Sequence, residues 1–338
     1  MEKILIIQTA FIGDAILTLP MIQKLKFVLP ESEIDILAIP STSEIFSASP
    51  YVDSTLIIDK RGKHRSIFSL LKFINELKKN NYNRIYSPHR SLRSSFIVMM
   101  IGVKNSYGFT NSSLKYVYKN LIKYNPRHHE VQRNLELIGY KADWKVLPEL
   151  HIPDSAENKA SNFILEYKLA GKIAAIAPGS IWNTKKYPEI YFKEVVKYLR
   201  GKSYSVVLIG SEKDKLLCDN IVQGFNEEVI SAAGKFTIME TIGFLKKVKI
   251  LVSNDSAPTH FGMCADIPVL TIFCSTVPEF GFLPYNCGSS FVSLNGLECK
   301  PCGIHGHETC PIKTFVCGYS LKPQIVTSKL EGMINGDV

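Results

Sequence analysis

The sequence contains no apolar run long enough to cross a membrane. Its longest wholly apolar stretch, residues 96–103, is far shorter than the about 18 residues that suggest a membrane-spanning helix. At the amino terminus, only four apolar residues separate Lys3 from Gln8, whereas the apolar region of a secretory signal has about 7 to 15 residues. We therefore expect the protein to stay in the cytoplasm.

Cysteine is absent from the first 217 residues. All eight cysteines follow, and four of them gather at Cys299, Cys302, Cys310 and Cys317. In a cytoplasmic chain of this size such cysteines are thiols or metal ligands more often than a disulfide framework. Structural zinc sites favour paired short spacings, and only Cys299 and Cys302 form such a pair. Both a zinc site and free or redox-sensitive thiols therefore stay open for this cluster.

Two motifs of phosphate chemistry are also missing. The loop after the first apolar run reads Gln-Thr-Ala-Phe-Ile-Gly and lacks the Gly-x-Gly-x-x-Gly pattern of dinucleotide-binding folds. This absence argues against a nicotinamide or flavin enzyme, and we expect no cofactor. No Asp-x-Asp occurs in the chain, so lysine, histidine and helix termini would stabilise a diphosphate leaving group in place of a carboxylate-held divalent cation. The sequence thus predicts a site without a metal.

Acidic residues are in deficit. Asp and Glu number 31 against 40 Lys and Arg, which gives a formal charge of +9 and a pI near 9.0. Such a balance implies an anionic partner, which could be nucleic acid, a phosphorylated lipid surface or a charged glycan. The basic residues are dispersed and form no compact stripe with interleaved aromatics, so we expect no nucleic-acid partner.

What the sequence does contain is an alternation of strand-like and helix-like segments in each of two halves. Hydrophobic residues make up 46% of the 338 residues, and this length favours about two domains. Helical periodicity marks residues 67–77, 189–199, 239–247 and 324–334. A polar stretch at residues 153–159 is the predicted linker. Strands are predicted at residues 4–7, 33–38, 54–58, 83–87, 173–177, 205–209, 250–253 and 269–273. The fold class is therefore α/β.

The segment from Asn254 to His260 is the most informative part of the chain, because it directly follows a predicted buried strand. Open parallel sheets present strand carboxyl ends and helix amino termini to one crevice, where unpaired N–H groups meet an anionic ligand. Asp255 and His260 are expected to flank a diphosphate there. Lys185 lies in another loop between a strand and a helix, where a lysine can neutralise a diphosphate. A solvated basic loop is the alternative for Lys185.

Four further positions are candidate site residues. Glu240, near a helix start in the second half, is predicted to accept hydrogen bonds from a ribose or a sugar. The alternative is that its charge only interacts favourably with the helix dipole. Asp14, beside Gly13 at the first strand–loop–helix junction, is predicted to point into a crevice. The alternative is that it only caps the helix. Arg90 and Arg93 follow a strand of the first half and offer planar donor forks to acceptor phosphates.

An arginine in an earlier loop, Arg61, has the same potential role, and an ordinary solvated surface is the alternative for all three arginines.

These segments together resemble the ADP-heptose:lipopolysaccharide heptosyltransferases of glycosyltransferase family nine. The resemblance runs over most of the chain, and the order of the motifs makes the joint match specific. The matching segments are Ile4-Leu5-Ile6-Ile7 through Ile12-Gly13-Asp14 with Leu19-Pro20; His129-Glu130-Val131-x-Arg133-Asn134-Leu135-Glu136-Leu137; Pro178-Gly179-Ser180 with Thr184-Lys185-Lys186-Tyr187-Pro188; Asn254-Asp255-Ser256-Ala257-Pro258-Thr259-His260; and Pro278-Glu279-Phe280-Gly281-Phe282.

The resemblance implies a GT-B architecture, in which two Rossmann-like parallel-sheet domains face each other across a cleft. Residues 1–155 would bind the acceptor, residues 156–322 would bind the ADP-sugar, and residues 323–338 would form a C-terminal helix. The reaction would invert the anomeric centre without a metal. Asp14 would be the general base on the acceptor hydroxyl, and Lys185 would stabilise the departing diphosphate.

The resemblance also implies the substrate-binding residues. Asp255 would hold the donor sugar, and Tyr187 stands in place of a tryptophan and is expected to preserve an aromatic wall. Pro258 has no N–H, and Ala257 stands where many relatives have glycine, so fewer or repositioned amide donors are expected. Donor binding is further expected of Ser180, Thr184, Glu240, Ser256, Ala257, Thr259 and His260, and acceptor binding of Gly13, Arg61, Arg90 and Arg93.

The implied function is transfer of a heptosyl unit from ADP-heptose to the inner core of lipopolysaccharide, with a lean toward the heptosyltransferase II type. Because that acceptor is anionic and lies at the inner leaflet, a basic enzyme would make peripheral contact with the inner membrane. Two alternatives stay open. One is a family-nine enzyme with another nucleotide sugar or glycan acceptor, and the other is a nucleotide- or nucleic-acid-binding protein without catalysis.

Overall fold

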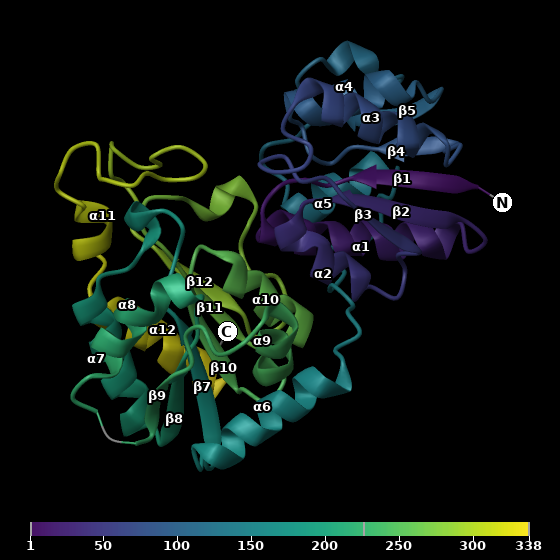
Figure 1. Cartoon of the computed structure of the whole chain (residues 1–338). Helices are drawn as coiled ribbons and strands as arrows, with labels where there is room; N and C mark the ends of the chain where they lie inside the picture. The colour runs from purple at the N-terminus through teal and green to yellow at the C-terminus, as the bar shows by residue number, and fades with distance from the viewer. Residues whose placement is uncertain (1, 226, 337–338) are drawn as a thin grey trace. The chain divides into compact units, whose positions relative to one another are not determined.

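The computed structural model describes residues 2–225 and 227–336. The chain divides into two compact units, unit 1 (Met1–His151) and unit 2 (Ile152–Val338), which are described one at a time (Figure 1). Each unit contains a six-stranded sheet in which every pair of neighbouring strands is parallel. Within the described ranges, no helix combines the length and apolar character that a membrane span requires.

Unit 1 is a sheet with helices on both faces. Its strand order is β3-β2-β1-β4-β5-β6. Helices α3 and α4 cover one face, where their apolar side chains pack with those of β1, β2 and β4, and α1, α2 and α5 lie on the other (Figure 1). The elements are β1 (Lys3–Ile7), α1 (Ile12–Val28), β2 (Glu33–Ala38), η1 (Pro40–Thr42), α2 (Ser43–Ser47), β3 (Ser54–Ile57), α3 (Ile67–Lys78), β4 (Arg84–Tyr86), α4 (Leu92–Ile101), β5 (Asn105–Phe109), η2 (Lys115–Val117), β6 (Asn120–Ile122) and α5 (Glu130–Leu137).

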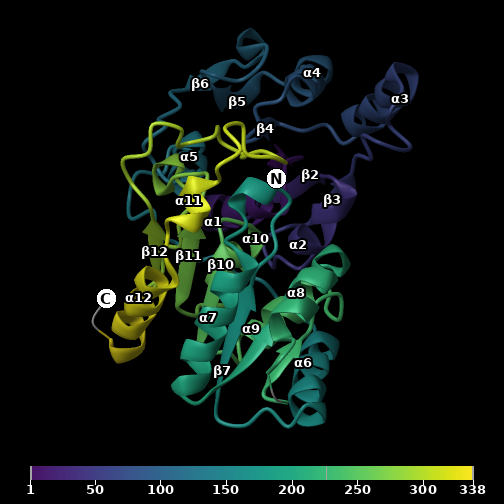
Figure 2. The same cartoon turned by 90° about the vertical axis from the view of Figure 1, so that its left-hand side faces the viewer.

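Unit 2 repeats this plan with the strand order β12-β11-β10-β7-β8-β9. Helices α7, α8 and α12 pack on one face, and α6, α9 and α10 lie on the other (Figure 2). The elements are α6 (Asp154–Glu166), β7 (Lys172–Ala177), η3 (Asn183–Lys185), α7 (Glu189–Gly201), β8 (Tyr204–Leu208), η4 (Glu212–Asp214), α8 (Lys215–Val222), β9 (Val229–Ser231), α9 (Ile238–Leu245), β10 (Ile250–Asn254), α10 (Ala257–Ala265), β11 (Val269–Phe273), η5 (Pro278–Phe280), β12 (Ser290–Ser293), α11 (Val316–Tyr319) and α12 (Pro323–Asn335).

Both sheets have the same topology when the strands are counted from the start of each unit. The first strand of each unit, β1 or β7, pairs with the second and fourth strands of that unit. The chain therefore reverses its direction of winding between β1 and β4 in unit 1, and between β7 and β10 in unit 2. Such switch points open a crevice at the carboxyl ends of the strands, where ligands bind in this class of fold.

The predicted α/β class with two parallel sheets is confirmed. All eight predicted strands and the four predicted helices are present within a few residues of their expected bounds. The predicted linker at residues 153–159 lies next to the division between the two units, but residues 154–159 form the first turns of α6 and not an irregular stretch. Asp154 and Glu157 lie in that first turn, where acidic residues favour the helix dipole, and Ala156, Ala160 and Phe163 form its buried side.

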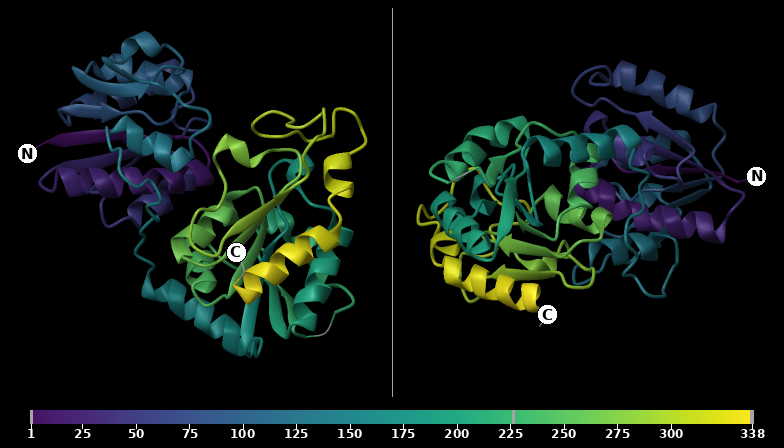
Figure 3. Two further views of the ribbon diagram at one scale, coloured as in Figure 1. Left: turned by 180° about the vertical axis from the view of Figure 1, so that it is seen from behind. Right: turned by 90° about the horizontal axis from the view of Figure 1, so that it is seen from below.

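The predicted C-terminal helix is α12, and it packs against α7 and β12 within unit 2 (Figure 3). Its apolar side chains Val326 and Leu330 are fully buried in the core of that unit. Residues 337–338 of the predicted C-terminal segment lie outside the described residues.

Candidate functional site

The switch point of unit 1 holds Asp14. This residue lies beside Gly13 in the first turn of α1, directly after β1. Its carboxylate accepts a hydrogen bond from the backbone N–H of Phe11, the N-cap residue of the helix. The capping interpretation of Asp14 is therefore correct in part, because the side chain satisfies one of the unpaired N–H groups at the helix start.

The environment of Asp14 favours its neutral form. Burial and the negative charge of Glu130 raise the pKa of Asp14 to about 7, against an ordinary value of 3.8, while the Phe11 N–H and the charge of Arg90 act in the opposite direction. A carboxyl group with a pKa near the operating pH is well matched to proton transfer as a general base. A strongly shifted group at a ligand crevice is also a functional-site candidate in its own right.

Basic side chains from the loops after β3 and β4 and from the first turn of α4 gather at the same edge of the unit 1 sheet. Lys60, which follows β3, donates from Nζ to the carbonyl oxygen of Thr9 at 2.6 Å. His89, which follows β4, lies 2.8 Å from Thr9 Oγ1 through its Nδ1. The charge of Arg93 adds to burial in lowering the pKa of Lys60 to about 8, so these two cations are close. One Arg93 nitrogen, Nη1, is buried and has no hydrogen-bond partner among the residues that the structure describes.

The predicted acceptor-binding arginines therefore have different surroundings. Arg90 lies with its guanidinium carbon 4.2 Å from the centre of the Tyr124 ring, and its charge acts on Asp14. Arg93 belongs to the first turn of α4. Arg61 is exposed, and it is its neighbour Lys60 that contacts Thr9. Sequence reasoning missed Lys60, although its place in the loop that follows β3 was a usable signal.

Helix α5 carries an acid toward Asp14. Glu130 is the first residue of α5 and forms a buried ion pair with Arg133, at 2.6 Å between Nη2 and Oε2. Arg133 also donates to the carbonyl oxygen of His128 at 2.7 Å. Asn134 donates to the carbonyl oxygen of Leu17 at 3.0 Å, which ties α5 to α1. Sequence analysis did not predict that residues 129–137 place an acid near Asp14 and tie α5 to α1.

The switch point of unit 2 joins Lys185 and Asp255. Lys185 ends η3 after β7, and Asp255 directly follows β10. Their Nζ and Oδ2 atoms are 2.6 Å apart, and both side chains are largely buried. Thr276, beyond the end of β11, donates to the same Asp255 oxygen at 2.7 Å. The solvated-loop alternative for Lys185 is thus wrong, since its amine has a fixed partner.

The two loops of this junction are held together by Asn254 and Ser256. Asn254 donates to the carbonyl oxygen of Pro178 at 2.7 Å and accepts from the Tyr187 N–H at 3.0 Å. Ser256, the N-cap residue of α10, donates to the carbonyl oxygen of Gly179 at 3.3 Å. The amino terminus of α10, which begins at Ala257, therefore lies beside the Lys185 loop and can face an anion.

Two residues of α10 have contrasting surroundings. Thr259 is fully buried, and its hydroxyl contacts the Asn254 carbonyl oxygen at 3.2 Å and Thr271 Oγ1 at 3.0 Å, so it supports the turn. His260 is also buried, yet its Nδ1 lacks a hydrogen-bond partner within the described part of the chain. Burial lowers the pKa of His260 to about 4, with Asp255 acting in the opposite direction. Its imidazole is therefore neutral at pH 7.

The remaining predicted donor residues occupy nearby turns. The Thr184 hydroxyl accepts from the His307 N–H at 2.8 Å. Ser180 accepts from the Trp182 N–H at 3.4 Å. Glu240 forms a capping box with Thr237, in which Oε2 accepts from the Thr237 N–H at 2.8 Å. The helix-start interpretation of Glu240 thus describes at least one of its two carboxylate oxygens.

Tyr187 does not form the expected aromatic wall. It is only 2% exposed, and its hydroxyl donates to the carbonyl oxygen of Leu321 at 2.7 Å. Its ring packs edge-on against Phe192, so it belongs to the core beneath α7. Trp182, from the same loop, keeps part of its surface in solvent and stacks with His305.

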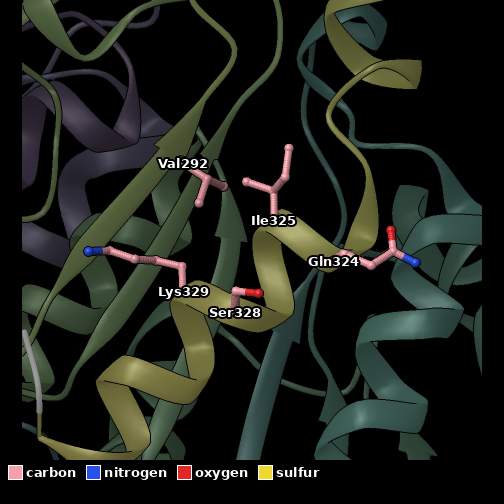
Figure 4. A pocket seen from close by; sticks show the side chains of 5 residues that line it. All are labelled: Val292, Gln324, Ile325, Ser328 and Lys329. Atoms are coloured by element: carbon pink, nitrogen blue, oxygen red, sulfur yellow. The ribbon is translucent and has the colours of Figure 1, made fainter.

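The cysteines of unit 2 are all free thiols. Across residues 2–225 and 227–336, no three or more His, Cys, Asp or Glu side chains are grouped to hold a metal ion. Turn N–H groups that hydrogen-bond to Cys310, from residues 312–315, lower its pKa against the opposing effect of burial. A shallow hollow between β12 and α12 is lined by Val292, Gln324, Ile325, Ser328 and Lys329 (Figure 4). It contains none of the candidate site residues.

Several heptosyltransferases are similar to this chain in sequence or in fold. Lipooligosaccharide heptosyltransferase 2 of Haemophilus influenzae is 24% identical over 295 residues, which covers 82% of this chain and 85% of that protein. Lipopolysaccharide heptosyltransferase 3 of Escherichia coli is 25% identical over 277 residues, with 79% and 82% covered. Similar solved structures include E. coli ADP-heptose lps heptosyltransferase II (TM-score 0.77, 19% identity, 99% of each chain) and a family 9 glycosyl transferase from Veillonella parvula (TM-score 0.83, 19% identity, 98% and 97%).

The family itself follows from a profile match. The profile of glycosyltransferase family 9 (heptosyltransferase) matches residues 70–313, which is more than half of the chain and includes Lys185, Glu240 and Asp255. The solved structures of similar fold agree with the two parallel sheets found here. The chain therefore belongs to glycosyltransferase family 9, the heptosyltransferase family, and is a glycosyltransferase.

Proposed function

We propose that the protein transfers a heptosyl unit from ADP-heptose to the inner core of lipopolysaccharide. The observation that carries the proposal is the Lys185–Asp255 pair at the switch point of unit 2, beside the amino terminus of α10. Relatives named as lipopolysaccharide heptosyltransferases, and a solved structure named for ADP-heptose, support the choice of donor and acceptor.

The donor in this proposal binds to unit 2 through its diphosphate. Lys185 exchanges Asp255 for the diphosphate, the amino terminus of α10 at Ser256 and Ala257 adds a positive dipole end, and His260 contributes as a neutral hydrogen-bonding group. Asp255, released from Lys185, accepts hydrogen bonds from the sugar. Ser180, Thr184 and Glu240 complete the donor contacts, and Thr259 supports the turn beneath them. Lysine and helix dipole can stabilise the leaving diphosphate without a divalent cation.

The acceptor in this proposal binds to unit 1. Lys60, Arg93 and Arg90 neutralise its phosphate and carboxylate groups, with Arg61 at the periphery and Gly13 beside the reacting hydroxyl. Asp14 removes the proton of that hydroxyl as its oxygen bonds to the anomeric carbon. The bond from that carbon to the diphosphate breaks, and ADP leaves with the electron pair. One direct displacement inverts the anomeric centre.

The site of action in this proposal is the cytoplasmic face of the inner membrane. Lysines and arginines number 21 against 13 aspartates and glutamates in residues 1–151, and 19 against 18 in residues 152–338. The excess positive charge thus belongs almost entirely to the unit assigned to the acceptor. An anionic lipid surface attracts such a unit by about 1 kcal/mol for each basic residue near it.

A transfer assay tests the proposal. The purified protein is incubated with ADP-heptose and either a Kdo-terminated or a heptose-terminated core, with EDTA present in parallel samples, and the products are weighed by mass spectrometry. We expect one heptosyl unit on the heptose-terminated acceptor, with inverted configuration by NMR and no loss with EDTA. A heptosyl unit gained only by the Kdo-terminated core would mean that the acceptor ends in Kdo and not in heptose. Transfer from UDP-sugars in place of ADP-heptose would contradict the donor, and no transfer from any nucleotide sugar would contradict the function.

A further inference from the structure

The cysteine-rich segment of unit 2 lies against the Lys185 loop. Its first anchor is Lys300, whose Nζ donates to the carbonyl oxygen of Phe273 at 2.9 Å and to Ser293 Oγ at 2.8 Å. The Cys302 N–H donates to the carbonyl oxygen of Ser275 at 2.9 Å. These contacts fix the start of the segment to the carboxyl ends of β11 and β12, at the same sheet edge as Asp255.

The second anchor joins the segment to η3, the turn that carries Lys185. The Thr184 N–H donates to the His307 carbonyl oxygen at 3.1 Å, and the His307 N–H donates to Thr184 Oγ1 at 2.8 Å. Asn183 adds a bond to Glu308 at 3.4 Å. Because Lys185 directly follows Thr184, the position of its backbone depends on this pairing.

Gly306 lies between the two anchors and is in direct contact with the candidate site. It is buried, and its φ of +79° favours glycine. A Cβ at this position would lie 2.9 Å from Thr184 Oγ1, 3.1 Å from Ser275 Oγ and 3.3 Å from Lys185 Cγ. Only a residue without a side chain lets the segment approach the Lys185 stem this closely. The hydroxyl of Ser275, which this Cβ would press on, is buried and has no hydrogen-bond partner within the described residues.

We propose that residues 305–308, the part of the segment that is paired with η3, form a wall of the donor site, in which Gly306 is a positioning residue for Lys185. The inference rests on the proposed function, because it assumes that the Lys185 amine binds the diphosphate of the donor. That amine lies 2.6 Å from Asp255 at the end of a side chain whose Cγ packs under Gly306. A shift of the stem by several tenths of an ångström moves the amine away from the diphosphate that it must meet.

Gly306→Ala and Gly303→Ala form a matched pair for the test. Gly303 belongs to the same segment and has a φ of +72°, but a Cβ there has nothing within 4 Å. Both substitutions therefore carry a similar backbone strain, and only the first one presses on Thr184, Ser275 and Lys185. The measurements are heptosyl transfer from ADP-heptose, ADP affinity by calorimetry, and Tm.

We expect Gly306→Ala to lower kcat/KM by about tenfold to a hundredfold and to weaken ADP binding, while Gly303→Ala leaves both within about twofold. Lys300→Met provides a second variant, which loosens the first anchor without touching Lys185, and it should also lower kcat/KM for protein that remains folded.

Two results would overturn the inference. One is equal activity and ADP affinity in the two alanine variants. The other is a loss in Gly306→Ala or Lys300→Met that only follows the fraction of unfolded protein. A wild-type protein that transfers no sugar would instead contradict the proposed function, and the calorimetric arm with ADP would still decide whether Gly306 shapes the nucleotide site.

Discussion

Asp14 combines a helix-start hydrogen bond with an environment that opposes its charge. The Phe11 N–H and Arg90 favour the carboxylate, whereas burial and Glu130 favour the neutral acid, and the second pair prevails with a pKa of about 7. A carboxylate in such surroundings is a stronger base than an ordinary aspartate. The same residue should therefore control both the rate of the reaction and its pH dependence.

Asp14→Asn should abolish most of the transfer and leave donor binding intact. Because the amide cannot accept the hydroxyl proton, we expect kcat to fall by about a hundredfold to ten-thousandfold, with ADP affinity by calorimetry nearly unchanged. In the wild type, kcat/KM should rise with pH through about 7 and reach a plateau, since the base acts when ionised. Parallel loss of ADP binding and turnover would show that Asp14 is structural, and a flat profile between pH 6 and 8 would contradict its role as the base.

The same pKa predicts that Asp14 destabilises the fold at neutral pH. The folded protein keeps this proton up to about pH 7, whereas the unfolded chain releases it near 3.8. The folded state therefore binds more protons in this window, and its stability falls as the pH rises from about 4 to 7. The full difference corresponds to about 4 kcal/mol. Asp14→Asn should raise Tm at pH 8 but hardly at pH 4. An unchanged or lower Tm at pH 8 would contradict the raised pKa.

At the scale of elements, α5 controls the charge around the start of α1. Glu130 enters the core with Arg133 as its partner, and Asn134 fastens α5 to the Leu17 carbonyl of α1. A buried pair of this kind contributes little net stability compared with apolar packing. Its placement is better explained by the negative charge that it keeps near Asp14.

Glu130→Gln should shift the pH profile of transfer to lower pH. Removal of the negative charge lowers the pKa of Asp14, so the rising limb of kcat/KM against pH moves in the acid direction. The variant also leaves the Arg133 guanidinium without its carboxylate, and Tm should fall. Glu130→Asp is the matched control, because it keeps the charge and should keep the midpoint near that of the wild type. A midpoint in Glu130→Gln that coincides with the wild type would leave Glu130 with a purely structural role.

The elements that sequence patterns reveal are the central strands and the helices beside them. β1, β2, β7, β8, β10 and β11 are mostly apolar and almost wholly buried, which is the usual signature of parallel strands. The strands missed by sequence reasoning are β5, β6, β9 and β12. β6, β9 and β12 are edge strands. β6 and β12 have mixed, partly exposed residues, β9 has only three residues, and β5 begins with Asn105 and Ser106. Local composition says little about such strands.

The residues of the candidate site likewise include some that sequence patterns reveal and others that they do not. The positions of Asp14, Lys185, Asp255 and His260 could be predicted from the sequence, because each belongs to a junction between a strand and the next helix, where parallel sheets bind ligands. Gly306 could not, since its role depends on a pairing between His307 and Thr184 across 123 positions. Tyr187 was misjudged for the converse reason, because a loop aromatic turned inward to the core of unit 2.

At the scale of the whole molecule, the basic charge is concentrated in unit 1. Within it, the loop before α3 exposes Lys63 and Arg65, and the first residues of α3, Ile67 and Phe68, are 53% and 82% exposed. Basic and apolar side chains next to one another suit an anionic lipid surface, because the charge attracts the unit and the apolar groups enter the interface.

Cosedimentation with vesicles measures this attraction. The protein should bind phosphatidylglycerol vesicles and not neutral phosphatidylcholine vesicles, and binding should fall steeply between about 0.1 and 0.5 M salt because the Debye length shortens. Lys63→Glu combined with Arg65→Glu should release most of the bound protein. Lys213→Glu with Lys215→Glu makes the same change of charge in unit 2 and should have little effect, while Tm and ADP affinity report on folding in both variants. Equal loss from the two double variants would mean that net charge alone acts, and binding that survives high salt would mean that apolar contact outweighs the charge.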